Sequence, residues 1–305
     1  MILEDLKKIE FFDNSLLNFD HDLSQLNWIN IGGKAKIYFF ANSLKDLSLF
    51  LKIYDQRGKI FILGAGSNIL FGDGIFDGAV IKLGKNFNNI SKLGENLVVS
   101  GSSCLDKKVS VFGMENSIEG FEFLSCIPGS IGGGIKMNAG CYGMEFKDII
   151  ISVQVIDFGG NVFQIPSNEI NFKYRSSDLP ENLIILSGTF RGKTSSKEKI
   201  KIIIDDLKNK KEITQPIRVK TSGSTFKNPI NQTKKKVWEL IKESIDINEV
   251  NKMFGDATLS EKHCNFLINK EKASSDDMKS LINFVKDKVY KKTGVKLELE
   301  IILTS

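Results

Sequence analysis

The segment at residues 127–143, IPGSIGGGIKMNAGCYG, restricts the fold of this chain more than any other stretch. Six of its seventeen residues are glycine. Glycine loses more backbone entropy on folding than any other residue and adds no side chain to a core. We therefore expect neither a helix nor a strand here, but a backbone that something approaches very closely.

A second glycine cluster, GAGSN at 64–68, allows a comparison with the common phosphate-binding motifs. The Rossmann fingerprint requires Gly or Ala where Ile69 stands, and a helix where residues 70–83 indicate turns and a strand. In GSIGGGIK the Lys-Ser/Thr pair of a P-loop is broken by Ile135 and Met137. Neither motif is complete.

What remains is a nest of backbone N–H groups that binds an anion, with side-chain donors from Ser67, Asn68 and Ser130. The alternative is that these glycines form tight turns between strands. GAGSN alone does not decide between a ligand-binding nest and such turns. The longer segment favours a ligand, because turns rarely need six glycines together with Asn138 and Tyr142.

Composition excludes several classes of protein. The chain has 305 residues, enough for two or three domains, and a formal charge of +5 with scattered lysines, so no nucleic-acid stripe is evident. The first twenty residues mix charges into every turn, which is unlike a signal peptide, and no apolar run reaches membrane-spanning length. Four cysteines without a CxxC pair, and His21 and His263 alone, predict no metal site and a reduced, cytoplasmic setting. A monomer is our separate expectation.

The periodicity predicts a mixed α and β chain. We expect a helix over 44–57 that ends at Gly58, strands over 59–64, 78–83, 96–101 and 181–191, and a hairpin over 151–165. Helical spacing returns over 197–211 and 233–247, a capping box at Ser274–Asp277 opens a further helix, and VKLELEI (295–301) alternates as a strand. The predicted domains are 1–84, 85–196 and 197–305.

Six segments in this order resemble the UDP-N-acetylenolpyruvoylglucosamine reductase family: ILGAGSNIL (62–70), IPGSIGGGIKMNAGCYG, YRSS (174–177), GSTFKNP (223–229), SEKHCNFLIN (260–269) and GVKLELEI (294–301). The short chain resembles the compact type II form. The resemblance implies an α+β fold with a two-part FAD-binding domain of the vanillyl-alcohol-oxidase/PCMH type and a C-terminal α/β substrate domain. It also implies non-covalent FAD, NADPH as reductant and an enolpyruvyl UDP-sugar as substrate.

The resemblance assigns FAD binding to the two glycine clusters. The implied residues are Gly64, Ala65, Gly66, Ser67, Asn68, Gly129, Ser130, Ile131, Gly132, Gly133, Asn138, Ala139, Gly140 and Tyr142. The chain departs from the family pattern near the N-terminal edge of this site, where Lys34 stands in place of a frequent proline.

Reduction of an enolpyruvyl ether needs a cation for the carboxylate, a proton donor and a hydride source. The resemblance assigns the cation to Arg175, the proton to Ser224 and the third catalytic position to Glu300. Without the resemblance, Arg175 could equally be a surface arginine, Ser224 a turn serine, and Glu300 part of a solvated strand face. Only the family pattern assigns this third position to Glu300 and not to Glu298, which lies on the same polar face of the predicted strand.

Substrate binding is assigned to Tyr174, Lys227 and Asn228, where charge-assisted bonds would hold phosphate or sugar. For His263, Asn265 and Asn269 we favour local hydrogen bonding that holds loops together. Two rival functions remain. One is an alcohol oxidase of the same superfamily, which rapid reaction of the reduced flavin with oxygen would favour. The other is a nucleotide-sugar-binding module without turnover.

Overall fold

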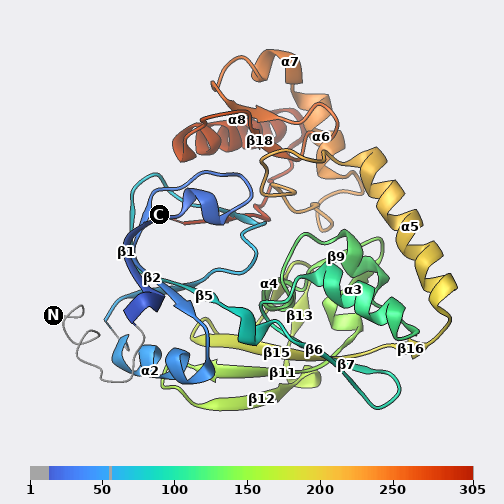
Figure 1. The fold of residues 1–305 in the computed structure, drawn as a ribbon. Helices are drawn as coiled ribbons and strands as arrows, with labels where there is room; N and C mark the ends of the chain where they lie inside the picture. Colours follow the sequence, from blue (N-terminus) through green and yellow to red (C-terminus); the bar gives the residue numbers. More distant parts are fainter. Residues whose placement is uncertain (1–13, 55–56, 305) are drawn as a thin grey trace. The chain divides into compact units, whose positions relative to one another are not determined.

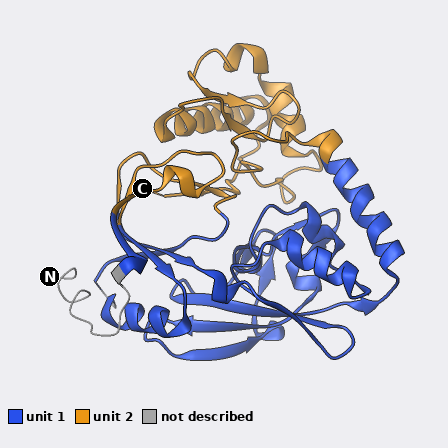
Figure 2. Ribbon diagram, in the orientation of Figure 1, with its two compact units in different colours: residues 1–19, 37–65, 77–211 blue, residues 20–36, 66–76, 212–305 orange. Residues whose placement is uncertain are grey.

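The computed structural model describes residues 14–54 and 57–304, and its contacts divide the chain into two compact units. Unit 1 contains residues 1–19, 37–65 and 77–211, and unit 2 contains residues 20–36, 66–76 and 212–305 (Figure 2). Most of the first twenty residues lie outside the described part of the chain. Among the described residues, no helix has the length and apolar character needed to cross a membrane.

A four-stranded sheet, most of it in unit 1, has the order β1-β2-β5-β3 (Figure 1). Its strands are β1 (Leu17–Asp22), β2 (Lys34–Ala41), β3 (Lys59–Ile62) and β5 (Ile75–Leu83), and β3 runs parallel to β5. Helix α2 (Leu44–Tyr54) buries Leu47, Phe50 and Leu51 in the same core. The Phe50 ring stacks on Phe39 of β2 with centroids 4.3 Å apart. The predicted continuation of α2 falls on residues 55–56, which are not described.

The second sheet of unit 1 has five antiparallel strands in the order β12-β11-β15-β7-β6. The strands are β6 (Ile90–Leu93), β7 (Leu97–Gly101), β11 (Ile150–Asp157), β12 (Val162–Pro166) and β15 (Leu183–Arg191). The predicted hairpin over 151–165 and the predicted strands over 96–101 and 181–191 are confirmed. Asp157 accepts hydrogen bonds from the backbone and side chain of Asn161, which fixes the turn.

Helix α4 (Ile131–Met137) corrects the expectation that the glycine segment contains no helix or strand. Ile131 and Ile135, one turn apart, are both fully buried in the core that covers the five-stranded sheet, and this burial holds the helix in place. Gly134 permits the close packing: a Cβ at this position would lie 2.3 Å from the Phe146 ring. The glycines therefore serve helix packing as well as loop geometry.

The remaining elements of unit 1 are short, apart from two helices. Helix α3 (Asp106–Glu115) precedes the 3-10 turn η4 (Glu122–Cys126), and α5 (Lys197–Thr214) confirms the predicted helix. Three two-stranded pairs also belong to this unit. They are β8 (Ile118–Glu119) with β16 (Lys193–Thr194), β9 (Gly140–Cys141) with β10 (Met144–Glu145), and β13 (Phe172–Lys173) with β14 (Ser176–Ser177).

Unit 2 has its own apolar core, built around helices α6 (Val237–Ser244), α7 (Ile247–Val250) and α8 (Ser275–Thr293). The predicted capping box at the start of α8 is confirmed, because Ser274 Oγ accepts from the Asp277 amide and Asp277 accepts from the Ser274 amide. Gly294 ends α8 with φ +74°. Strand β17 (Ala257–Leu259) pairs with β18 (Leu267–Asn269), and β4 (Ile69–Leu70) pairs in parallel with β19 (Ile302–Leu303).

The predicted strand over 295–301 is wrong as a sheet strand. The alternation is real, since Val295, Leu297 and Ile301 are buried, but the extended segment makes a single antiparallel bridge, Leu299 to Phe226. Its partner is the loop GSTFKNP and not another strand. The Lys227 amide donates to the Glu298 carbonyl at 2.9 Å, and the Glu300 amide donates to the Thr225 carbonyl at 2.8 Å.

The mixed helix and strand content confirms the predicted α+β class. The compact units divide the chain at different residues from the predicted domain boundaries after 84 and 196. Those boundaries stay a prediction about domains, whereas the units follow spatial contact.

Candidate functional site

The two glycine clusters meet in unit 1 at Ser130. A Cβ on Gly64 would lie 2.6 Å from Ser130 Oγ, so only glycine permits this approach. Lys82 donates to the Gly64 carbonyl at 3.0 Å, and burial lowers the pKa of Lys82. Ser130 Oγ is buried and has no hydrogen-bond partner within the protein. This hydroxyl is therefore available to a ligand that reaches the glycine backbone.

A buried carboxyl group lies beside the same segment. Asp106, in the first turn of α3, is fully buried, and neither of its oxygens has a hydrogen-bond partner. A Cβ on Gly129 would lie 2.5 Å from Asp106 Oδ2, and the Asp106 amide donates to the Gly129 carbonyl. Burial raises the pKa of Asp106 well above its usual value.

Sequence reasoning missed Asp106, because an acidic residue in the first turn of a helix is ordinarily a solvated capping group. Two further hydroxyls near the segment, those of Ser102 and Ser110, are also buried without a partner. Ser110 follows Asp106 by one helical turn, and the Ser102 carbonyl accepts from the Gly132 amide at 2.8 Å. Buried polar groups are rarely left unpaired, so the set fits a ligand with several hydrogen-bonding groups.

Asn138 ends α4 in the left-handed conformation and organises the residues around Arg175. It is fully buried, and Nδ2 donates to Glu145 Oε2 at 3.1 Å and to the Lys173 carbonyl at 2.9 Å. Oδ1 accepts from the Lys147 amide at 2.9 Å. The predicted ligand residue Asn138 is thus also a structural link between three segments.

Arg175 occupies a strained turn after β13, with φ +56°. Its Nη2 donates to the Gly140 carbonyl at 2.8 Å, and Nη1 lies 3.7 Å from Glu145 Oε1. The guanidinium also lies over the Tyr174 ring, 4.9 Å from its centroid. These contacts join Arg175 and Tyr174 to the end of the glycine segment. Tyr142, at φ +54°, is exposed.

In unit 2 the structure brings Ser224 and Glu300 to adjacent segments. The Glu300 amide bonds to the carbonyl of Thr225, the neighbour of Ser224, and Asn68 Nδ2 donates to the Glu300 carbonyl at 3.0 Å. A Cβ on Gly223 would lie 3.7 Å from the Ser67 carbonyl. The end of GAGSN, the start of GSTFKNP and the end of GVKLELEI therefore come together.

Amide side chains hold the GSTFKNP loop in shape. Asn265 Oδ1 accepts from the Phe226 amide at 3.0 Å, and its Nδ2 donates to the Phe226 carbonyl at 2.9 Å. Asn269 Nδ2 donates to the Ile29 carbonyl at 2.9 Å. Asn228 Oδ1 accepts from the Val237 amide at the start of α6. Asn265 and Asn269 thus make the local hydrogen bonds expected of them, whereas the substrate role of Asn228 stays a prediction.

His263 packs edge-on against Phe266, with centroids 4.9 Å apart, and burial lowers its pKa. Among the described residues, no group of three or more His, Cys, Asp or Glu side chains is arranged to hold a metal ion.

The predicted residues are divided between the units. Unit 1 contains Gly64, Ala65, the predicted positions from Gly129 to Tyr142, Tyr174 and Arg175, and unit 2 contains Gly66, Ser67, Asn68, Ser224, Lys227, Asn228 and Glu300.

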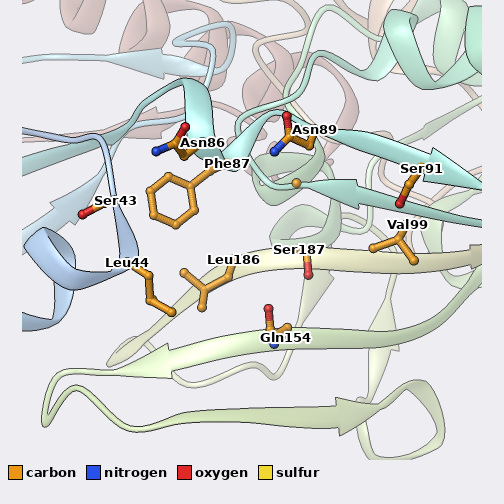
Figure 3. Close-up of a pocket in the computed structure, with 11 residues that line it drawn as sticks. Ser43, Leu44, Asn86, Phe87, Asn89, Ser91, Val99, Gln154, Leu186 and Ser187 are labelled. Carbon is orange, nitrogen blue, oxygen red and sulfur yellow. The ribbon is translucent and has the colours of Figure 1, made fainter.

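A pocket of about 340 Å³ in unit 1 contains none of the predicted site residues (Figure 3). It is lined by uncharged groups, among them Asn86, Asn89, Gln154 and Ser187. The lining contains no cation or carboxylate that would fix an ionic ligand, and we assign it no role.

Two family models match this chain. Residues 35–165 match a family model described as an FAD binding domain. Residues 215–304 match the model for the C-terminal domain of UDP-N-acetylenolpyruvoylglucosamine reductase.

Whole-chain relatives carry the same name. The reductase of Pelagibacter ubique is 56% identical over 301 residues, covering 99% of each chain, and that of Rickettsia massiliae is 46% identical over 282 residues, covering 92% of this chain and 93% of the relative. The crystal structure of the Thermus caldophilus reductase superposes with a TM-score of 0.78 at 26% identity, covering 95% of this chain and 98% of that one. The chain therefore belongs to the UDP-N-acetylenolpyruvoylglucosamine reductase family.

Proposed function

We propose that Arg175, Ser224 and Glu300 carry out the reaction of this family. That reaction is the FAD-dependent reduction of UDP-N-acetylglucosamine enolpyruvate, a step in peptidoglycan precursor synthesis. The observation that carries the assignment is the hydrogen bond from the Glu300 amide to the Thr225 carbonyl at 2.8 Å, which holds the Glu300 and Ser224 segments side by side.

The chemistry sets the requirements. The enolpyruvyl alkene is electron-rich, so its carboxylate must accept charge as the double bond is reduced. Arg175 binds this carboxylate with its planar guanidinium and stabilises the growing charge, which a lysine ammonium would do less well. Ser224 donates a proton to the adjacent carbon, and Glu300 shares in controlling that protonation.

FAD supplies the hydride when bound, and we propose that the predicted glycine-cluster residues hold it without a covalent bond. Three observations support the fit: the unpaired hydroxyl of Ser130, the unpaired carboxyl of Asp106, and the glycine backbone that would clash with Ser130 if Gly64 carried a Cβ. His21 and His263 lie outside the glycine clusters, which supports non-covalent attachment.

We further propose that Tyr174, Lys227 and Asn228 bind the UDP-sugar, that NADPH is the reductant, and that the protein acts as a monomer in the cytoplasm. Lys227 supports the phosphate role, since its amide is fixed by the Glu298 carbonyl at 2.9 Å within the GSTFKNP loop. The four free cysteines support a reducing compartment.

The first experiment is anaerobic. NADPH is added to the purified holoenzyme, followed by UDP-N-acetylglucosamine enolpyruvate, while the yellow flavin absorbance is recorded. We expect bleaching by NADPH and recovery on addition of the enolpyruvyl sugar. Recovery only with air would contradict the substrate assignment and favour an oxidase.

Ser224→Ala tests the proton donor. We expect bleaching by NADPH at the wild-type rate, and recovery by substrate slowed by about 10³-fold, because general acid catalysis contributes roughly 10²–10⁴-fold. Ser224→Cys keeps an ionisable hydrogen at the position and should restore part of the rate. Turnover of Ser224→Ala within tenfold of wild type would contradict the role of Ser224.

A further inference from the structure

Two cysteines flank most of the glycine segment of unit 1. Cys126 is the last residue of η4 and directly precedes the segment, and Cys141 lies in β9 near its end. β9 packs against η4, so the fold returns the chain to its starting point after fifteen residues. The Cys126 and Cys141 thiols are close enough for each to shift the pKa of the other.

Polar groups surround the pair on several sides. Cys141 Sγ donates to the Phe123 carbonyl at 3.3 Å, and Ser125 Oγ lies 3.7 Å from Cys126 Sγ. Lys211 of α5 donates from Nζ to the Cys126 carbonyl at 2.9 Å. Lys208 acts on Cys126 and Arg175 on Cys141 at longer range through their positive charges.

These neighbours make the two thiols unequal. The neighbouring Cys141 thiol, followed by Ser125 and the charges of Lys211 and Lys208, lowers the pKa of Cys126. The neighbouring Cys126 thiol and burial raise the pKa of Cys141. Burial lowers the pKa of Lys211, while the two thiols act in the opposite direction. The arrangement pairs a thiolate with a neighbouring thiol, which is the combination that oxidises to a disulfide.

We propose that Cys126 and Cys141 form a redox-active pair that a small peroxide oxidises to an intramolecular disulfide. Cys126 is only 6% exposed, so a small oxidant such as hydrogen peroxide reaches its sulfur more readily than a large one. The Cys126 thiolate attacks one oxygen of hydrogen peroxide, the O–O bond breaks, hydroxide leaves, and a sulfenic acid forms. The Cys141 sulfur then attacks the Cys126 sulfur, the S–O bond breaks, and the oxygen leaves as water with the Cys141 proton.

The disulfide would close residues 126–141 into a covalent loop that contains α4. Arg175 Nη2 donates to the Gly140 carbonyl, next to Cys141, so bond formation changes the position of a contact of Arg175. This consequence rests on the proposed function, whereas formation of the bond does not.

Tryptic peptide mapping tests the bond directly. Trypsin cuts after Lys108, Lys136 and Lys147, which places Cys126 on peptide 109–136 and Cys141 on peptide 137–147. The FAD-loaded full chain is treated with hydrogen peroxide, alkylated and digested without reductant. We expect these two peptides to be joined, at a mass 2 Da below their sum, with the number of alkylated cysteines falling from four to two, and dithiothreitol reversing both changes.

Variants make the assignment specific. Cys126→Ser and Cys141→Ser should each abolish the linked peptide. Cys104→Ser and Cys264→Ser serve as matched controls and should retain it, because burial raises the pKa of both thiols. Separate peptides after treatment, or Cys126 carried to sulfinic acid without a link, would overturn the proposal.

The coupling to Arg175 has its own readout. We expect the oxidised protein to differ at least threefold in substrate KM, with recovery after reduction. A mapped disulfide with unchanged KM would support the modification site and overturn the coupling. Failure of the proposed function would leave the peptide map unaffected.

Discussion

Asn138 Nδ2 donates a hydrogen bond to Glu145 Oε2 at 3.1 Å, and through Glu145 the end of α4 is connected to Arg175. The carboxylate thus receives an amide on one oxygen while the other lies 3.7 Å from the guanidinium. A residue predicted to line a dinucleotide therefore also fixes the neighbour of the proposed catalytic cation.

Asn138→Ala should destabilise the protein by about 3 kcal/mol, because it leaves the Lys173 carbonyl and the Lys147 amide without their buried partner. Asn138 also has φ +46°, which alanine adopts with strain. Urea unfolding at pH 7 measures the loss.

Asn138→Gly is the matched variant, since glycine adopts the left-handed conformation without strain. Asn138→Gly should be more stable than Asn138→Ala by about 1 kcal/mol, because it removes the backbone strain but does not restore the lost hydrogen bonds. A loss below 1 kcal/mol in Asn138→Ala would contradict the structural role of the amide.

Arg175→Lys should lower kcat by about 10²-fold, the order expected for removal of one preorganised donor to a developing charge. A single ammonium cannot bond the Gly140 carbonyl and present a planar fork to a substrate carboxylate. Steady-state kinetics measure the effect, and the rate of bleaching by NADPH is the control that should not change. An unchanged kcat would remove Arg175 from the proposed set.

Asp106→Asn should change the pH dependence of stability in FAD-free protein. The raised pKa means that folded Asp106 keeps a proton that the unfolded chain releases above a pH of about 4, so unfolding releases a proton and stability falls as pH rises. The fall, about 1.4 kcal/mol per pH unit, continues until the pH passes the folded pKa. Asp106→Asn should lack this fall, so the difference in unfolding free energy between the variant and wild type should shift in favour of the variant as pH rises.

Asp277→Asn provides a control of opposite sign. Hydrogen bonds from Ser274 lower the pKa of Asp277, so its contribution to stability is present above the unfolded pKa and is lost as pH falls. Unfolding free energies measured from pH 4 to pH 8 distinguish the two, because Asp106→Asn should diverge from wild type as pH rises, whereas Asp277→Asn should stay parallel to wild type until the pH falls below about 4. Parallel profiles for wild type and Asp106→Asn would show that Asp106 ionises without cost.

Asn265→Ala should reduce both stability and turnover, because its amide makes two hydrogen bonds to Phe226, two residues from Ser224. We expect a loss of about 2 kcal/mol and a fall in kcat of tenfold or more. Asn269→Ala is the comparison: Asn269 is equally buried in unit 2 but bonds Ile29 and Ala273. It should lose similar stability while kcat stays within threefold. Equal kcat losses would contradict a specific role for Asn265 in shaping the loop.

Local chemistry made parts of the fold predictable. The Ser274–Asp277 box, the Gly294 stop and the hairpin around Gly160 each depend on nearby residues, and the structure has all three. The segment at 295–301 kept its alternation of buried positions, but the sequence does not reveal that its partner is a loop. The helix of the glycine segment depends on Phe146, because only that ring explains Gly134.

The candidate site was also predictable only in part. Motif residues such as Ser224 and Glu300 were named from sequence, and the structure adds the Thr225 carbonyl that connects their segments. Asp106 carries no motif, and its burial without a partner emerges only when Gly129 approaches it. The sequence cannot show that a carboxyl such as that of Asp106 is buried without hydrogen-bond partners, because this depends on residues brought together by the fold.

The composition of unit 2 limits how this protein can be divided or exchanged with relatives. Strand β19 pairs with β4, and the core around α8 includes Ile29 and Leu70, far upstream in the chain. A gene fragment encoding residues 212–305 alone would leave an unpaired strand edge and an incomplete apolar core. A chimaera that replaces residues 212–305 would have to carry residues 20–36 and 66–76 from the same parent, because the three stretches pack into one compact unit.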